Sequence, residues 1–168
     1  MTNDLTLAIC MYNAEKYIKE TLQCIMAQTV QEFHLLIVND CSTDNSVQIV
    51  EDFFKRNLRQ YELVNLPKNG GLCAGRRFVE EYVITKYLLF VDADDWLSVD
   101  ACEQIANAVE DKKLLYLWGA NKVATNSIEK LVTVQKKDMP SLIADIISVS
   151  KGQNIFIRSP WAKVYKRS

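Results

Sequence analysis

Short apolar runs alternate with amphipathic segments over roughly the first 110 residues, and this alternation limits the fold more than any other feature. The apolar runs are typical of buried strands, which we expect at 5–11, 33–38, 61–66 and 87–91. Apolar residues between them recur at helical spacing, which predicts helices over 14–28, after 42–44, from the turn 67–71 to about 83, and from 98 or 100 to 109. Strands joined by helices imply an α/β fold, a parallel sheet with helices on both faces.

Caps and the less regular remainder complete the expected organisation. Asn13 is expected to cap the first helix, and Ser42, Thr43 and Asp44 the second. Beyond residue 110 the pattern predicts strands at 114–123 and 129–134 with a hairpin around 126–127, a short helix at 141–148, and extended or loop segments at 156–161 and 163–165. Because no repeat or linker interrupts the chain, we expect residues 1–168 to form a single domain with its own core.

Charge and cysteine content exclude several classes of protein. The chain has 20 basic and 21 acidic residues, so it lacks the general positive field of a nucleic-acid-binding protein, and no nucleic-acid partner is expected. Five widely spaced cysteines with one histidine, His34, favour reduced thiols and a cytoplasmic protein. The N-terminus has no signal-peptide pattern and no apolar run is long enough to span a membrane.

Polar residues follow three of the four predicted strands. They are Tyr12 with Asn13, Asn39 with Asp40, and the run Asp92, Ala93, Asp94 and Asp95. In a parallel sheet with helices on both faces, ligands bind outside the carboxyl ends of the strands. We therefore expect these residues to meet at one edge of the sheet and form a binding site.

The acidic run 92–95 carries the strongest chemical signal. Asp92 and Asp94 alternate along an extended chain and so share a side, while Asp95 begins a turn toward the same cavity. Carboxylates this close repel one another unless water solvates them or a divalent cation joins them. An oxygen-rich site suits Mg²⁺ or Mn²⁺, which commonly bridges carboxylate to diphosphate. The alternative is an acidic loop that caps the helix opening near Ser98.

Two other segments suggest contacts with a nucleotide or sugar. Asp40 at a strand end is suited to accept hydrogen bonds from a base or ribose, although a turn aspartate is an equal alternative. Residues 69–77 start a helix with small residues, which let the backbone approach a phosphate, but they match neither a GxGxxG motif nor a P-loop. Arg76 and Arg77 are suited to neutralise phosphate, or are surface arginines.

Asp92 and Asp94, separated by one residue, also suggest a phosphatase with an aspartate nucleophile. Such a motif normally ends the first strand and has Thr or Val two residues after the second aspartate. Here it follows the fourth predicted strand and Trp96 occupies the later position. The phosphatase hypothesis fails on both counts.

Five segments occur in an order and spacing that identify a family. They are LAICMYNAE (7–15), QT (28–29), IVNDCSTD (37–44), NGGLCAGR (69–76) and FVDADD (90–95). Together they resemble the family 2 glycosyltransferases of the GT-A fold, and the resemblance extends through 161–166. It implies a Rossmann-like, mostly parallel sheet and a single nucleotide-sugar-binding domain.

The resemblance also implies site residues and a reaction. The resemblance implies a UDP-linked sugar as the donor. This nucleotide-sugar would be held by Cys10, Tyr12, Asn13, Glu15, Asp40, Arg76, Asp92 and Asp94. Within this set Tyr12 would stack on the nucleobase and Asp40 would hydrogen-bond it. Asp94 and Asp95 of the DXD-type motif would bind Mg²⁺ or Mn²⁺. The implied reaction is metal-dependent, inverting transfer of the sugar to an acceptor hydroxyl.

The chain departs from the family pattern at four positions. Cys10, Asn39, Cys41 and Arg77 stand where Pro, Asp, Gly and Asn are usual. In the family the general base follows the segment matching 161–166, so we expect it beyond Ser168 and name no base here. A non-catalytic nucleotide-sugar-binding module, or an inactive fragment, is therefore the alternative. The family further implies a glycan or lipid-linked acceptor and admits a peripheral contact with the inner face of the membrane; the sequence leaves the oligomeric state open.

Overall fold

A computed structural model describes residues 4–108 and five short strands beyond them, with side chains described up to residue 107. Its first eight elements are β1 (Leu5–Met11), α1 (Ile18–Met26), β2 (His34–Asn39), α2 (Ser46–Arg56), β3 (Glu62–Asn65), α3 (Gly71–Tyr82), β4 (Tyr87–Asp92) and α4 (Ala101–Ala108). Strands and helices alternate as the sequence predicts. No helix in the described part is both long and apolar enough to cross a membrane.

The central sheet combines a parallel part with an antiparallel extension. The strand order is β3-β2-β1-β4-β9-β5-β8, in which β1 pairs in parallel with β2 and β4, and β2 with β3. The extension consists of β9 (Lys163–Lys166), β5 (Leu115–Leu117) and β8 (Gln135–Lys137). A separate antiparallel pair joins β6 (Asn121–Ala124) to β7 (Ser127–Lys130). The parallel part confirms the predicted α/β, GT-A type of sheet.

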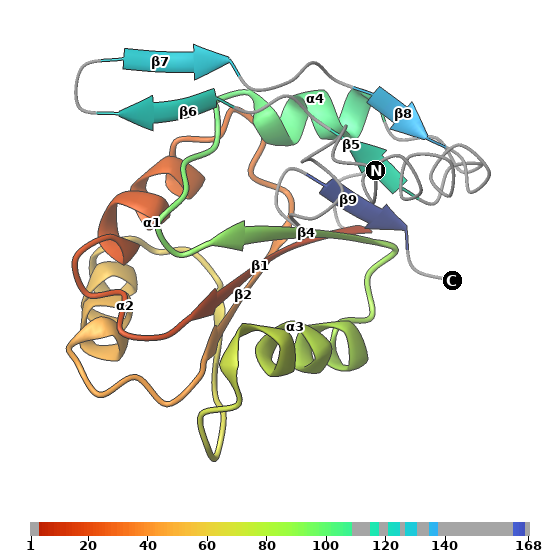
Figure 1. Cartoon of the computed structure of the whole chain (residues 1–168). Helices are drawn as coiled ribbons and strands as arrows, with labels where there is room; N and C mark the ends of the chain where they lie inside the picture. The colour runs from red at the N-terminus through yellow and green to blue at the C-terminus, as the bar shows by residue number, and fades with distance from the viewer. Residues whose placement is uncertain are drawn as a thin grey trace.

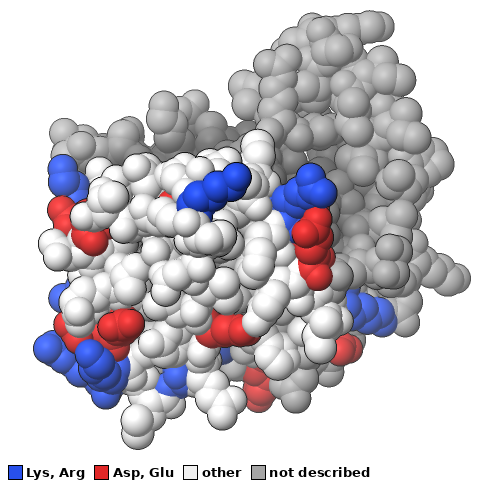
Figure 2. Space-filling view, turned by 90° about the horizontal axis from the view of Figure 1, so that it is seen from below, with Lys and Arg blue, Asp and Glu red and all other residues white. Residues whose placement is uncertain are grey.

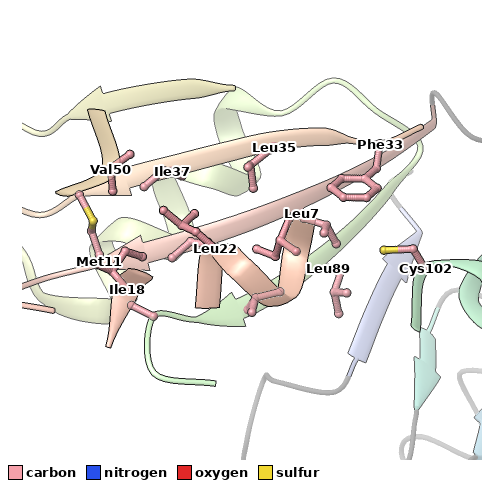
Figure 3. Close-up of a cluster of buried hydrophobic side chains, with 14 of the residues drawn as sticks. Leu7, Met11, Ile18, Leu22, Phe33, Leu35, Ile37, Val50, Leu89 and Cys102 are labelled. Carbon is pink, nitrogen blue, oxygen red and sulfur yellow. The ribbon is translucent and has the colours of Figure 1, made fainter. Parts of the chain in front are cut away.

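Helices cover both faces of the parallel strands, α3 on one side and α1 and α2 on the other (Figure 1). Successive residues of a strand point to opposite faces, so β1 directs Leu7 and Ile9 toward one helical layer and Ala8 toward the other. Figure 3 shows the larger core, in which Leu22 of α1 and Val50 of α2 lie against the sheet. Burial on both faces explains why the strands read as continuous apolar runs.

The predicted start of the first helix is wrong. Asn13 does not cap α1, which begins at Ile18 after a turn in which the Tyr17 and Ile18 N–H groups donate to Ala14 O at 2.9 Å. Asn13 itself has φ 49°, a left-handed conformation that leads the chain out of β1. Its side chain bonds the loop after β2 instead, a tertiary contact that local sequence does not reveal.

The region beyond α4 differs in detail from the prediction. The single expected strand at 114–123 is divided between β5 and β6, which belong to different sheets. The predicted hairpin exists as β6 and β7, although β7 is shifted toward the N-terminus relative to 129–134. The extended segment at 163–165 is confirmed as part of β9. The predicted helix at 141–148 and the segment 156–161 lie outside the described residues.

Candidate functional site

The carboxyl ends of β1, β2 and β4 lie side by side. In the register of the sheet Met11 is opposite Asn39, and Cys10 is opposite Asp92. The loops that leave these strands therefore start from one edge, and residues separated by dozens of positions in the chain meet there. Seen from the side of α3, acidic and basic residues are interspersed with uncharged ones, without a continuous field of one sign over the described surface (Figure 2).

Asp40 connects the end of β2 to the start of α3. Its side chain is only 4% exposed; Oδ1 accepts the N–H of Gly70 at 2.8 Å and Oδ2 accepts the N–H of Gly71 at 2.7 Å. Gly71 has φ 77°, and a Cβ on Gly70 would lie 2.6 Å from the Cβ of Ala74, so both positions favour glycine. Asp40 is thus held rigidly as an acceptor-only group by backbone donors that also begin the helix.

Arg76 and Arg77 have different roles. The Arg76 guanidinium lies 2.5 Å from Asp92 Oδ1 and 5.5 Å from the centre of the Phe90 ring, and its side chain is 14% exposed. Arg76 Nε is buried and has no hydrogen-bond partner among the described residues. Arg77 is exposed and pairs with Glu81 one helical turn later. The surface-arginine alternative therefore holds for Arg77. Arg76 instead belongs, with Asp40 and Asp92, to a group of charged residues at the strand ends, the strand-end cluster.

Cys10 fills the space between β1 and α3. A Cβ placed on Gly75 would lie 3.4 Å from Cys10 Sγ, so the helix approaches the strand closely at this point. Burial raises the pKa of the Cys10 thiol to about 12; the charge of Arg76 opposes this shift, and those of Asp92 and Asp40 add to it. Cys10 is therefore a neutral packing group that faces α3.

Asn13 ties the loop after β1 to the loop after β2. Its Oδ1 accepts the N–H of Thr43 at 2.8 Å, and its own N–H donates to Ser42 Oγ at 3.0 Å. Asparagine tolerates the left-handed backbone that this connection requires. The adjacent Tyr12 remains 51% exposed, so its ring is displayed at the strand end while its neighbour is fixed.

Glu15 and Asp44 continue the same connection. Glu15 Oε2 accepts the N–H and the side-chain amide of Asn45 at 3.1 and 2.9 Å, and the N–H of Glu15 donates to Asp44 Oδ2 at 3.0 Å. Asp44 Oδ1 also accepts the N–H of Ser46, the first residue of α2. Of the three predicted caps, Asp44 is therefore the one whose side chain meets the start of the helix.

The acidic run leaves two carboxylates at the surface. Asp92 ends β4 and pairs with Arg76, whereas Asp94 and Asp95 are exposed in the turn that follows. Partial burial, together with the negative charges of Asp92 and Asp94, raises the pKa of Asp95 to about 6. Helix capping does not account for this run, because α4 begins at Ala101, whose N–H donates to Ser98 O.

The fit of this turn to a divalent cation rests on its donor set. No group of three His, Cys, Asp or Glu residues within the described part forms a complete cage. Two exposed carboxylates beside a third negative charge nevertheless match the way Mg²⁺ is usually held, by one or two carboxylates with substrate phosphates and water. Asp94 and Asp95 therefore fit a cation that is bound together with a diphosphate.

Two buried polar residues that contact the loop after β4 have no role in the sequence-based site. Thr21 and Gln28 contact the β4–α4 loop (residues 93–100), through Ala93 O and Ser98 O respectively. Gln28 belongs to the pair Gln28-Thr29, which the resemblance includes without a function. Thr21 is a polar residue on the buried face of an amphipathic helix. That position is the feature of the sequence that could have indicated a structural role for it.

Comparison with known proteins agrees with this architecture. A teichoic acid poly(glycerol phosphate) polymerase of Staphylococcus epidermidis is 40% identical over 96 residues, which cover 57% of this chain and 13% of the relative. Poly(ribitol-phosphate) β-N-acetylglucosaminyltransferase TarS of Staphylococcus aureus is 34% identical over 117 residues, covering 66% of this chain and 20% of the relative. The chain thus spans a minor part of the length of these relatives.

The structure of S. aureus TarS 1–349 in complex with UDP is similar in fold, with a TM-score of 0.73 and 25% identity over 97% of this chain and 46% of that chain. The family model for Glycosyl transferase family 2 matches residues 6–168. The parallel sheet, the strand-end cluster and this match over almost the whole chain agree: the chain belongs to glycosyltransferase family 2.

Proposed function

We propose that this chain binds a UDP-sugar and provides the donor site of a metal-dependent, inverting glycosyltransferase. The observation that carries the proposal is the convergence of Asp40, the Arg76–Asp92 pair and the exposed Asp94 and Asp95 at one edge of the sheet. Related TarS structures contain UDP and UDP-GlcNAc, and the chain resembles them over 97% of its length. That similarity supports UDP as the nucleotide.

The nucleoside is proposed to lie across the ends of β1 and β2. The exposed ring of Tyr12 offers a stacking surface for the nucleobase. Asp40 can accept a hydrogen bond from the base, because each of its oxygens uses only one lone pair on the α3 backbone. Asn13 and Glu15 hold the loops after β1 and β2 together, and Cys10 packs beneath them on the α3 side.

The diphosphate is proposed to lie at the start of the β4–α4 loop. Arg76 keeps Asp92 in place and adds a positive charge beside the phosphates. Asp94 and Asp95 would hold Mg²⁺ or Mn²⁺ there. When bound, the cation supplies positive charge that stabilises the leaving diphosphate.

For the acceptor the proposal names only a chemical class, and for the proton transfer it names no residue. The family suggests that the acceptor hydroxyl belongs to a glycan or to a lipid-linked molecule. It also suggests that the protein acts in the cytoplasm, in peripheral contact with the membrane. Inverting transfer requires a base for the acceptor proton, and we assign none of the described residues to it. A donor-binding module without turnover remains the alternative.

Calorimetric titration with UDP, UDP-GlcNAc and GDP, each with and without Mn²⁺, tests the proposal. We expect UDP and UDP-GlcNAc to bind more tightly with Mn²⁺, and GDP to bind more weakly than UDP. The same tight binding without release of UDP from UDP-GlcNAc, in the presence of acceptor glycans, would favour the module. Absence of any metal-dependent UDP binding would contradict both the donor site and its metal.

A further inference from the structure

Two buried side chains hold the β4–α4 loop at both of its ends. One is Thr21 in α1 and the other is Gln28, just after α1. Thr21 is 1% exposed, and its hydroxyl donates to Ala93 O at 2.9 Å. Gln28 is 4% exposed, and its Nε2 donates to Ser98 O at 2.7 Å and to Cys24 O at 3.3 Å. The first contact lies between Asp92 and Asp94, and the second lies where the loop approaches α4.

Gln28 also holds the beginning of α4. Its Oε1 accepts the N–H of Cys102 at 2.9 Å, so one amide side chain joins the end of α1, the end of the loop and the start of the next helix. Thr29 reinforces this junction, because its N–H donates to Val99 O and its hydroxyl to Glu103 Oε2, both at 2.9 Å. A buried amide with donor and acceptor both in use is costly to replace by an apolar group.

Three of the four residues between the two anchors are exposed, and the fourth packs inward. Asp94, Asp95 and Trp96 are exposed, and Trp96 retains 56% of its accessible surface. Leu97 packs against the main core and keeps the middle of the loop against the α1 side of the sheet. The exposed carboxylates therefore depend on anchors that lie beneath them, inside the protein.

We propose that Thr21 and Gln28 are positioning residues for the donor site. By fixing the backbone at Ala93 and Ser98, they set where Asp94 and Asp95 are presented to a cation and diphosphate. This inference rests on the proposed function for its ligand, but the anchoring itself is a property of the chain without ligand. The anchoring also gives a role to Gln28, which is buried and therefore not placed to contact a nucleotide directly.

The test compares variants that remove an anchor with variants that keep it. Thr21→Val removes the hydroxyl at nearly constant volume, and Thr21→Ser keeps it. Gln28→Leu removes all three contacts of the amide side chain. Asn57→Ala is the matched control, because the Asn57 amide donates to Phe53 O at the end of α2, at 2.8 Å, and contacts neither anchor.

Two measurements are made on each variant of the full chain. Hydrogen–deuterium exchange of the peptide covering 93–100, without ligand, reports the anchoring, and Mn²⁺-dependent UDP titration reports the site. We expect Thr21→Val to speed exchange of this peptide about tenfold, the factor that corresponds to one lost buried hydrogen bond, and Gln28→Leu to speed it at least as much because more contacts are lost. The same variants should weaken Mn²⁺-dependent UDP binding about tenfold, the smaller end of the effect seen for partners that orient metal ligands.

Thr21→Ser and Asn57→Ala should leave both measurements within about twofold of the parent chain, whatever their melting temperatures. Unchanged exchange in Thr21→Val would overturn the anchoring, and faster exchange with unchanged UDP affinity would overturn the positioning role. If Gln28→Leu does not fold, the Thr21 pair still decides. If the parent chain binds no UDP, the proposed function fails, and the exchange data alone show whether the anchors exist.

Discussion

At the scale of single residues, two positions adopt left-handed backbone without being glycine. Asn13 has φ 49° and Cys41 has φ 59°. Asparagine tolerates this region, and Asn13 uses it to bond the neighbouring loop. Cys41 stands where the family usually has glycine, and its Sγ donates to Leu66 O at 3.0 Å. The thiol contact partly offsets a backbone cost that glycine avoids.

This cost predicts an order of stability at position 41. Cys41→Gly and Cys41→Ala both lose the contact with Leu66 O, so they differ in backbone preference. We expect the glycine variant to have the larger free energy of unfolding, by about 1 kcal/mol, in urea denaturation. At Cys24, inside α1, the same two substitutions should show the reverse order, because alanine favours a helix. Equal stability of the two variants at 41 would argue against the left-handed conformation.

Thiol reactivity separates buried from exposed cysteines. Burial raises the pKa of Cys10 and of Cys102 to about 12, because the thiolate is disfavoured away from water, and nearby Arg76 and Arg59 respectively oppose the shift. At pH 8 only about one in ten thousand of such thiols is ionised.

We therefore expect iodoacetamide at pH 8 to modify the exposed Cys73 well before Cys10 or Cys102, as followed by peptide mass spectrometry. Raising the pH to 9 should still leave both buried thiols largely unmodified, since their pKa lies far above it. Equally fast modification of Cys10 in the folded protein would show that it is accessible and ionised.

At the scale of elements, the approach of α3 to β1 decides where Arg76 lies. Gly75 faces Cys10, and the next residue along the helix is the partner of Asp92. At position 10 the family usually has proline, which has no thiol. Here the Cys10 thiol lies where the helix passes, and the facing residue is Gly75. A glycine within a helix costs stability relative to alanine, so its presence here reflects the space that Cys10 occupies.

A double-mutant cycle tests this packing. With Cys10 present, the Cβ of Gly75→Ala would lie 3.4 Å from Sγ, at the short limit of van der Waals contact, so we expect part of its gain in helix propensity to be lost. In the Cys10→Ala background the same substitution should stabilise the protein by up to about 1 kcal/mol. Urea denaturation of the four proteins gives the coupling free energy. A coupling of zero would mean that the two residues do not constrain each other.

Contacts between elements also explain why Asn39 can stand where the family usually has aspartate. Asn39 donates to Asn65 Oδ1 at 2.8 Å and accepts the N–H of Ser42 at 3.0 Å, so it joins β2 to β3 and to the following loop. An ionised aspartate has acceptors alone, so it would keep the first contact only if the Asn65 amide turned over to donate instead. Asp40 carries the bonds to α3 independently.

At the scale of the whole molecule, the proposed donor site draws on three strands and on one helix from each face of the sheet. Ligand binding to such an assembled site stabilises the folded chain by mass action, by about 2.7 kcal/mol at a ligand concentration one hundred times the dissociation constant. We expect UDP with Mn²⁺ to raise the melting temperature in differential scanning fluorimetry, and UDP alone to raise it less.

Substitutions of the exposed carboxylates should separate the metal-dependent part of this effect. Asp94→Asn and Asp95→Asn should lose most of the additional shift caused by Mn²⁺ while keeping the smaller shift caused by UDP alone. Asp100→Asn is the matched control, since Asp100 lies in the same loop but bonds Gln104 at the start of α4. Retention of the full Mn²⁺ shift in both Asp94→Asn and Asp95→Asn would contradict their assignment as metal ligands.

The sequence by itself determined the order of elements up to α4 and the meeting of polar strand ends at one edge. Periodicity and parallel topology are local and general properties, so they can be derived from residue patterns. Only the tertiary structure showed that Asn13 bonds the loop after β2, that Asp40 accepts the N–H groups at the start of α3, and that Arg76 but not Arg77 turns inward. It also revealed the anchors at Thr21 and Gln28. These facts depend on contacts between residues far apart in the chain, and one-dimensional patterns do not encode which distant partner a polar side chain will meet.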